Sequence, residues 1–400
     1  MKVSGIICEY NPFHNGHLHH IEETRRNGAT HIAAVMSGNF VQRGETAVID
    51  KHTRARLAVE CGADLVIELP VQYCLASAEY FARGGVWLLN SLGAVDELSF
   101  GSECGDIAAL LGAADTTERI RTECAEEIKR MMENGYTYPR ALSEAVRENA
   151  PEAAEMIAEP NNLLGIEYIR ALREFSSEIE PYTVKRESAM HNDDHPTGNM
   201  ASAGFIRENI IKNSNGADPY AYMPEVWADE IVRAASEGRI AATERLERVI
   251  LYKLRTASTE EISRINDVGQ GLEYRIAGAR EAASLDELLE AVKTKRYTLA
   301  RIKRIMMSLI LGITREDMEH LPPYGRILAM NGRGREILAR AKGRSKVPYA
   351  GSLARLGQQG GTAARFAELE GRAGDIFGLA LADISQCRSD FREKMIVNME

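Results

Sequence analysis

The sequence predicts an α/β fold in which a parallel sheet is covered by helices on both faces, followed by a mainly α-helical second half. Two observations lead to this prediction. Short apolar runs alternate with helical stretches through the first half of the chain, and such alternation builds parallel sheets that bind ligands at the carboxyl ends of their strands. After Arg207 nearly every segment has the apolar period of an α-helix.

The first half is predicted to contain buried strands with helices between them. The expected strands are residues 3–8, 31–36, 64–69, 97–100 and 182–185. The expected helices are residues 17–26, 51–61, 76–89, 107–114, 117–133, 139–148 and 162–175. The stretch 105–175 is almost purely helical and interrupts the alternation, so we expect a helical insertion before the last strand, within a first domain of residues 1–212.

A turn-rich linker opens the second half. Residues 213–219 read Asn-Ser-Asn-Gly-Ala-Asp-Pro, which is typical of a loop. The helices expected beyond it are residues 225–236, 242–257, 260–265, 285–295, 301–311 and 332–342. The pair Pro322-Pro323 breaks the helical pattern. We therefore expect residues 213–400 to form a mainly α-helical domain, with a small mixed tail after Val347.

Composition indicates a cytoplasmic protein. With 400 residues and 44% hydrophobic content, the chain is long enough for two or three domains with their own cores. No apolar run is long enough to span a membrane, and the first residues lack the features of a signal peptide. The six cysteines are scattered without a Cys-x-x-Cys pair, as in a protein with reduced thiols.

The charges are distributed unevenly along the chain. Residues 1–200 carry 18 Lys and Arg against 31 Asp and Glu, whereas residues 201–400 carry 31 against 27. Residues 293–346 alone hold 14 basic and 4 acidic residues. One concentrated basic segment in a chain of net charge −9 suggests that a polyanion docks there, although a solvated helical surface would give the same pattern.

The turn between the first strand and the first helix has the chemistry of a phosphate site. The strand should end at about Glu9 and the helix should begin near Gly16 or His17. A helix N-terminus favours a phosphate, and Gly16 lets the backbone approach it closely. His14 and His17, one helical turn apart, can both point at the same phosphoryl group. Two imidazole donors would stabilise charge on the α-phosphate and on the leaving pyrophosphate.

Two other interpretations of this histidine cluster remain open. His14, His17, His19 and His20 could hold a metal ion, or they could be incidental surface residues. The spacing is not His-x-x-x-His, and no cysteine or carboxylate cluster lies beside it. We therefore predict phosphate chemistry and no protein-bound metal.

Two motifs together resemble the nucleotidyltransferase superfamily. The tetrapeptide His-Asn-Gly-His at residues 14–17 follows the first strand, and residues 201–207 read Ala-Ser-Ala-Gly-Phe-Ile-Arg. In the second motif Ser202 and Arg207 fall on phosphate-binding positions, while Gly204 stands where Thr is usual. Alone, this segment could be an anion site or an ordinary capped helix. The resemblance implies a Rossmann-like nucleotidyltransferase domain.

Longer stretches resemble the bacterial tRNA(Met) cytidine acetate ligase family. These are residues 6–17, 36–44, 160–168, 271–273, 293–298 and 301–304. The resemblance spans residues 1–345, and residues 357–400 match no pattern. It implies a ligase that joins acetate and ATP into acetyl-adenylate and pyrophosphate. The acetyl group would then pass to N4 of the wobble cytidine of elongator tRNA(Met), giving N4-acetylcytidine and AMP.

The resemblance also assigns residues to the substrates. The catalytic residues would be His14, His17, Ser202 and Arg207. The ATP site would be lined by Ile7, Cys8, Glu9, Tyr10, Asn11, Pro12, Phe13, His14, Asn15, Gly16, His17, Leu18, His19 and His20, and completed by Gly101, Asn162 and Arg186. ATP would be a substrate, accompanied by Mg²⁺. No obligatory protein partner is predicted.

Several of these assignments have ordinary structural alternatives. Gly101 follows a strand at the ligand-binding edge of the sheet. Asn162 could cap a helix, and Arg186 could pair with Glu187 or another acidic neighbour. The glycine-bounded loop at residues 37–44 should bring Asn39, Gln42 and Arg43 near the acetate or the cytidine, unless it is a plain connection. Lys51 and Arg54 could meet phosphates or tRNA, or be solvated.

The basic segment is predicted to bind tRNA. Its candidate phosphate contacts are Lys293, Lys295, Arg296, Arg301, Lys303 and Arg304, followed later by Arg333, Arg335, Arg340, Lys342, Arg344 and Lys346. Tyr297 could stack on a base. Two alternatives compete with the ligase: a small-molecule adenylyltransferase of cofactor synthesis, such as a pantetheine or nicotinate adenylyltransferase, and a non-catalytic ATP-dependent RNA-binding protein.

Overall fold

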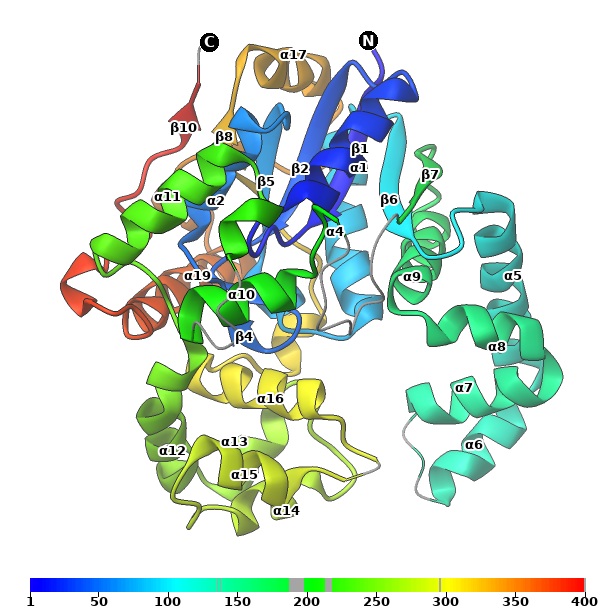
Figure 1. Ribbon diagram of the computed structural model, residues 1–400. Helices are drawn as coiled ribbons and strands as arrows, with labels where there is room; N and C mark the ends of the chain where they lie inside the picture. The colour runs from blue at the N-terminus through cyan, green and yellow to red at the C-terminus, as the bar shows by residue number, and fades with distance from the viewer. Residues whose placement is uncertain (135, 137, 187–197, 213–217, 295, 399–400) are drawn as a thin grey trace.

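The central sheet is built mainly from the first half of the chain. The computed structural model describes residues 1–134, 136, 138–186, 198–212, 218–294 and 296–398. Its parallel strands follow the order β5 (Leu65–Leu69), β2 (His31–Ser37), β1 (Val3–Cys8), β6 (Glu97–Ser102) and β7 (Glu180–Lys185) (Figure 1). Every strand predicted from the sequence is present, and the α/β fold class is confirmed.

Three further strands come from the second half of the chain. β8 (Gly325–Met330) pairs antiparallel with β5, while β9 (Tyr349–Ala350) and β10 (Ile396–Val397) pair parallel with β8. The sequence did not predict β8, because its short run Gly-Arg-Ile-Leu-Ala-Met contains a charged residue, Arg326, and lies among helical segments from which its pattern does not distinguish it. The sheet therefore includes residues on both sides of residue 212, and the division into domains 1–212 and 213–400 stays a prediction.

Alternate residues of β1 face opposite sides of the sheet, as the period of a strand requires. Val3 and Ile7 belong to the core on one face, and Ile6 and Cys8 to the core on the other. The first face is covered by α4 (Ala78–Leu92), α9 (Pro160–Glu174) and α17 (Gly332–Ala341), and the second by α1 (Asn15–Arg26), α2 (Lys51–Glu60) and α11 (Glu225–Ser236). Burial on both faces explains why the strands read as continuous apolar runs.

Two groups of helices have cores of their own. The insertion consists of α5 (Ile107–Glu123), α6 (Ala125–Glu133), α7 (Tyr138–Asn149) and α8 (Pro151–Ala158). The second group, here called the helical cluster, consists of α12 (Glu247–Thr256), α13 (Thr259–Arg264), α14 (Leu272–Gly278), α15 (Leu285–Val292) and α16 (Leu299–Leu311). The core of the helical cluster also includes Phe40, Val71 and residues of α19 (Gly361–Gly378), so it is continuous with the sheet domain.

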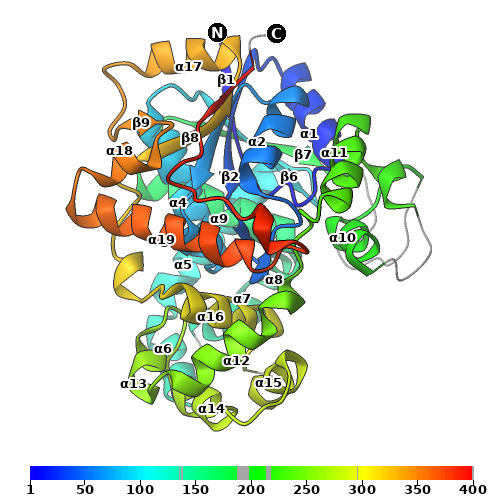
Figure 2. The ribbon, with the colours of Figure 1, turned by 90° about the vertical axis from the view of Figure 1, so that its left-hand side faces the viewer.

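The helical cluster and α17 lie at opposite ends of the molecule. The cluster lies beyond the carboxyl ends of the parallel strands, and α17 lies at their amino ends (Figures 1 and 2). The remaining elements are β3 (Phe40–Val41), β4 (Glu45–Thr46), α3 (Val71–Cys74), α10 (Ala203–Lys212) and α18 (Leu353–Gly357), with short 3-10 turns at Pro219–Tyr222, Thr243–Leu246, Glu316–Met318 and Ile384–Gln386. None of the helices in the described ranges combines the length and apolar character that a membrane crossing needs.

Candidate active site

A pocket of about 280 Å³ opens at the carboxyl ends of β1 and β6. Of the residues predicted for the site, those that line it are Ile7, Cys8, Glu9, Tyr10, Asn11, His14, His17, His20, Gln42, Arg43, Gly101, Arg186, Ser202 and Arg207. A smaller adjoining recess is lined by Gly16 and His19 together with five of these residues. The structure thus brings segments as distant as residues 7 and 207 into one cavity, as the sheet topology requires.

His14 and His17 form the N-terminal cap of α1. Nδ1 of His14 accepts the N–H of Gly16 at 3.1 Å, and Nδ1 of His17 accepts the N–H of His14 at 3.2 Å. The two rings stack with centroids 3.8 Å apart. Because both Nδ1 atoms are acceptors, each neutral ring carries its proton on Nε2. The pair therefore offers two N–H donors beside the positive end of a helix.

The charge state of these histidines follows from their surroundings. Burial, reinforced by the positive charges of Arg186 and Arg207, lowers the pKa of His14 to about 3. Burial and His14 hold the pKa of His17 well below its usual value. Burial and Arg186 lower the pKa of His20 to about 4. The rings are thus neutral donors at pH 7 until an anion raises their pKa values.

Ser202, directly before α10, and Arg207 within α10 also line the pocket. Ser202 Oγ accepts the N–H of Phe205 at 3.1 Å, so this hydroxyl caps the helix and also lines the pocket. Arg207 Nη1 donates to the carbonyl of Asn11 at 2.8 Å, and its Nη2 lies 3.6 Å from Oε2 of Glu45. The arginine is thereby fixed against the turn that carries the histidines.

The three residues that were predicted to lie near the acetate or the cytidine occupy two different places in the structure. The β3–β4 hairpin holds Gln42 and Arg43 at the pocket. Asn39 is buried away from it, where Oδ1 accepts the N–H of Lys51 at 2.9 Å. The prediction for Asn39 is thus not supported by its position, because its side chain holds the start of α2.

Glu9 contributes a carboxylate to the pocket lining. Burial raises its pKa, against the lowering effects of the Gln42 N–H and of Arg207. Its Oε1 accepts the N–H of Gln42 at 2.7 Å. Glu9 therefore ties the hairpin to the end of β1.

Asn161, rather than Asn162, faces the pocket. Oδ1 of Asn162 accepts the N–H of Cys104 at 3.1 Å, and the side chain is buried. Asn161 lines the cavity, and its Oδ1 lies 3.4 Å from Nη1 of Arg186. Sequence reasoning also missed Glu103, which accepts the N–H groups of both asparagines. No local pattern could reveal this, since Glu103 lies 58 residues before Asn161.

Part of the pocket wall is apolar. Phe81 of α4, Phe100 of β6, and Leu164 and Tyr168 of α9 line it. In the sequence these residues carry the same signal as core positions, which is why none was predicted as a site residue.

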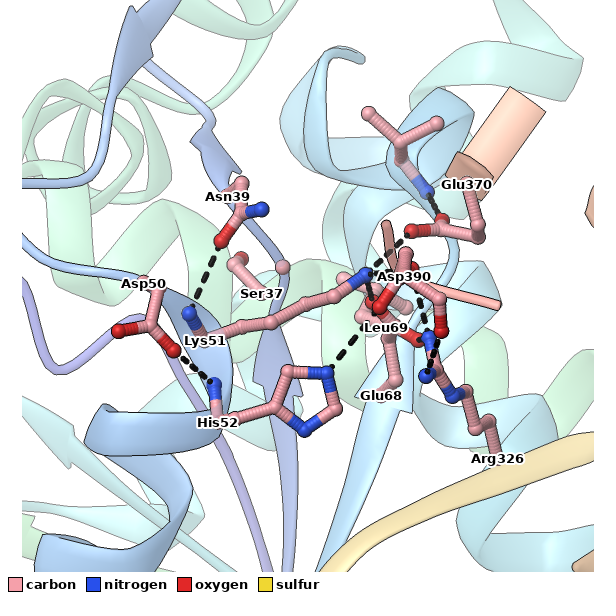
Figure 3. A network of polar contacts seen from close by, with 12 residues as sticks. Ser37, Asn39, Asp50, Lys51, His52, Glu68, Leu69, Arg326, Glu370 and Asp390 are labelled. Atoms are coloured by element: carbon pink, nitrogen blue, oxygen red, sulfur yellow. Dashed lines mark hydrogen bonds and ion pairs between the residues drawn. The ribbon is translucent and has the colours of Figure 1, made fainter. Parts of the chain in front are cut away.

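Lys51 and Arg54 are neither at the pocket nor solvated. Arg54 is fully buried and donates to backbone carbonyls, among them Ser37 at 3.1 Å. The Lys51 ammonium lies 2.7 Å from Asp390 and 3.1 Å from Glu370, and it also contacts Glu68 (Figure 3). These expectations were wrong, because both cations are buried and bind groups inside the protein.

The same three carboxyl groups could form a metal site. Among the described residues, Glu68, Glu370 and Asp390 lie close enough together to hold a metal ion. Lys51 and Arg326 already occupy that position, with Arg326 Nη1 3.1 Å from Glu68 and 2.7 Å from Asp390. We therefore interpret the cluster as a closed ion-pair network (Figure 3).

The basic segment does not form one continuous surface. Lys293 is exposed, whereas Lys303 pairs with Glu45 at 2.7 Å, and both Arg301 and Arg304 pair with Asp267. Arg296 is half-buried and donates to Gln270, and Lys295 lies outside the described residues. The later cations include those of α17, the helix that comes after β8 and lies at the amino end of the sheet. There Arg340 pairs with Asp96.

The prediction for Tyr297 is also corrected by the structure. Its ring is 6% exposed and belongs to the core of the helical cluster, while the guanidinium groups of Arg296 and Arg301 lie 5.5 and 5.4 Å from its centroid. The ring cannot serve as a stacking platform for a base in this arrangement.

Comparisons with known proteins agree with this geometry. Residues 1–392 match the family described as HIGH Nucleotidyl Transferase. The tRNA(Met) cytidine acetate ligase of Acetivibrio thermocellus is 40% identical over 366 residues, 87% of each chain, and that of Alkaliphilus metalliredigens is 38% identical over 401 residues, 95% of each. Crystal structures of Thermotoga maritima TmcAL, 30% identical over the whole of both chains, superpose with TM-scores of 0.93 for an apo form and 0.91 for a form bound with alpha-thio ATP.

These matches confirm the resemblance on which the sequence prediction rested. The family model covers residues 1–392, and therefore the first motif, the second motif and the helical cluster alike. The chain therefore belongs to the HIGH nucleotidyl transferase family and, within it, to the tRNA(Met) cytidine acetate ligases.

Proposed function

We propose that the chain is an ATP-dependent ligase that acetylates N4 of the wobble cytidine of elongator tRNA(Met). The observation that carries this proposal is the pair of Nε2–H donors of His14 and His17, next to Arg186 and Arg207 in one pocket. Relatives named tRNA(Met) cytidine acetate ligase support the choice of acid and acceptor.

The first step would be adenylation of acetate. An acetate oxygen attacks the α-phosphorus of ATP, and the bond to the β-phosphate oxygen breaks to release pyrophosphate. The two imidazoles, the positive end of α1 and Arg207 stabilise the charge that develops on the phosphates. No covalent protein intermediate is needed, so the residues act by position and charge.

Mg²⁺ would enter as part of the nucleotide. Among the described residues, the pocket lining includes a single carboxylate, Glu9, and that group already accepts the N–H of Gln42. Phosphate oxygens and water would therefore supply most of the ligands, as Mg²⁺ prefers in nucleotide sites. The residues present fit a MgATP substrate better than a resident metal.

The second step would transfer the acetyl group to RNA. The cytidine N4 amine attacks the acetyl carbonyl, loses a proton and releases AMP. We assign Gln42 and Arg43 to the vicinity of acetate or cytidine, because the hairpin places both at the pocket. An anticodon loop presents its bases unpaired, so no duplex has to be opened.

The helical cluster would position the tRNA. Lys293 is exposed at the end of α15, and with Lys295 and Arg296 it would contact backbone phosphates.

The six cysteines are free, in accord with the reducing cytoplasm where we place the reaction.

The test combines enzyme, ATP, labelled acetate and unmodified elongator tRNA(Met), followed by digestion to nucleosides. We expect labelled N4-acetylcytidine, formed only when both ATP and acetate are present. Pyrophosphate exchange that needs another acid, or acetylation without acetate, would reject the proposal. A cofactor-synthesis adenylyltransferase would instead consume ATP with a small alcohol or nucleotide and leave the tRNA unchanged.

A further inference from the structure

The β3–β4 hairpin packs directly on helix α16. Gly44, between the two strands, has a φ of +74°, and a Cβ on it would lie 2.4 Å from the backbone nitrogen of Arg304 and 2.5 Å from the carbonyl carbon of Lys303. Only glycine fits this backbone conformation and this approach. The helical cluster therefore touches the hairpin that carries Gln42 and Arg43 to the pocket.

Polar groups strengthen the same contact. Lys303 Nζ lies 2.7 Å from Oε1 of Glu45. Arg304 Nη1 lies 3.5 Å from the carbonyl of Gln42, and its Nη2 lies 3.2 Å from Oδ2 of Asp267. Two cations that the sequence assigned to tRNA phosphates thus have partners inside the protein.

The second carboxylate oxygen of Glu45 lies near Arg207 of the pocket. Oε2 lies 3.6 Å from Nη2 of Arg207, whose Nη1 donates to the Asn11 carbonyl at 2.8 Å. Burial acts to raise the pKa of Glu45, but Lys303, Arg207 and Arg43 together lower it, so the carboxylate is charged. One carboxylate therefore bridges an arginine of the phosphate site and a lysine of the helical cluster.

We propose that Glu45 and Lys303 are positioning residues for adenylation, holding the guanidinium of Arg207 at the phosphate site. This inference rests on the proposed function. A residue of the half that is assigned to tRNA binding would then be needed for the half-reaction that involves no tRNA. The sequence prediction, in which Lys303 contacts tRNA phosphates, leads to the opposite expectation.

The expected effect concerns activity more than stability. The side chains of Lys303, Glu45 and Arg207 are 27%, 24% and 15% exposed, so the ion pairs are partly solvated and contribute little to folding. Arg207 must nevertheless be oriented closely, because displacement of a catalytic group by about 1 Å can cost on the order of 100-fold in rate.

The experiment measures acetate-dependent ATP–pyrophosphate exchange without tRNA. The variants are Glu45→Gln, Lys303→Met, their double combination and Lys303→Arg, which keeps the charge. The matched control is Lys253→Met, since Lys253 pairs with Glu261 at 2.5 Å within the same helical cluster but away from the hairpin. Thermal unfolding of each variant reports folding.

We expect Glu45→Gln and Lys303→Met each to lower kcat/KM for ATP about tenfold or more, and the double variant to be no worse than the more impaired single one. Lys303→Arg should recover most of the activity, and Lys253→Met should resemble the wild type. A Lys303→Met enzyme with normal exchange but weak tRNA acetylation would overturn the inference. So would additive losses in the double variant, or an equal loss in Lys253→Met. A wild-type enzyme without acetate-dependent exchange would instead reject the proposed function.

Discussion

His14 serves two purposes through the two nitrogens of one ring. Nδ1 caps α1 by accepting the Gly16 N–H at 3.1 Å, and Nε2 is left as a donor in the pocket. The residue therefore combines a local folding role with a role toward phosphate. The two roles can be separated, because asparagine is a good N-cap but does not place an N–H where Nε2 lies.

Replacement of His14 by Asn or by Ala should separate these roles. Both variants should lose pyrophosphate exchange by at least about 100-fold, the range for removal of one preorganised donor. Only His14→Ala should lose the cap, which is worth about 1 kcal/mol of unfolding free energy. Urea unfolding and exchange kinetics measure the two effects. An active His14→Asn enzyme would show that Nε2 is dispensable.

The neutral His14 ring should also shape the acid stability of the protein. Its pKa is about 3 in the folded chain, against an ordinary value of 6.5, so the unfolded chain binds a proton that the folded chain does not. This contribution to stability is fully present above pH 6.5 and is lost as the pH falls toward 3. From pH 6 to 5, the wild type should lose on the order of 1 kcal/mol more unfolding free energy than His14→Asn. Equal pH slopes in urea titrations would contradict this expectation.

Helix α2 is fastened to the rest of the molecule by the buried ion-pair network of Lys51. Burial and Glu68 raise the pKa of Glu370 to about 8, so at pH 7 this carboxyl keeps its proton. Two cations, Lys51 and Arg326, then balance two carboxylates, Glu68 and Asp390. The network joins α2, β5, β8 and α19 without a net charge.

Lys51→Met and Glu370→Gln should therefore differ widely in stability. Removal of the Lys51 ammonium leaves Arg326 as one cation for the two buried carboxylates of Glu68 and Asp390. One buried negative charge is then uncompensated, and breaking a buried ion pair costs about 3–5 kcal/mol. Glutamine has nearly the same shape as a protonated glutamate. The free energy of unfolding should therefore fall much less in Glu370→Gln than in Lys51→Met. Urea unfolding at pH 7 compares the two variants. If Glu370→Gln lowered the free energy of unfolding as much as Lys51→Met, Glu370 would be ionised in the folded protein.

The elements that sequence predicts best are those with strong local patterns. The strands of the first half and the start of α1 follow from apolar runs and from the turn at residues 9–16. The partners of Asn39, Asn162 and Lys303 were not predictable, because each contact joins two different elements of the fold. Such contacts depend on how the elements pack against one another, which no local pattern encodes.

At the scale of the whole molecule, the sheet draws on both ends of the chain. Residues 1–212 alone would expose the edge of β5 that β8 covers and would lack Arg326, Glu370 and Asp390. They would also lose Trp227, whose ring stacks 5.7 Å from that of Phe13 beside the histidine turn.

The fragment 1–212 should consequently fail to fold as an ATP-binding unit. We expect it to aggregate, or to show no cooperative thermal transition, because it carries an uncovered strand edge and unpaired buried charges. Circular dichroism and size-exclusion chromatography of the fragment, with the full chain as control, measure this. A monomeric fragment with a sharp transition would support the division at residue 212 as a true domain boundary.

The position of Asp390 has a consequence for biosynthesis. It lies 339 residues after the lysine that it neutralises. A ribosome adding roughly 5–20 residues per second makes the two tens of seconds apart. During that interval the growing chain contains Lys51 and Glu68 but not the carboxylate of Asp390 that completes the buried network. A message truncated near its 3′ end would therefore yield a product that includes every pocket residue and is nevertheless open to proteolysis.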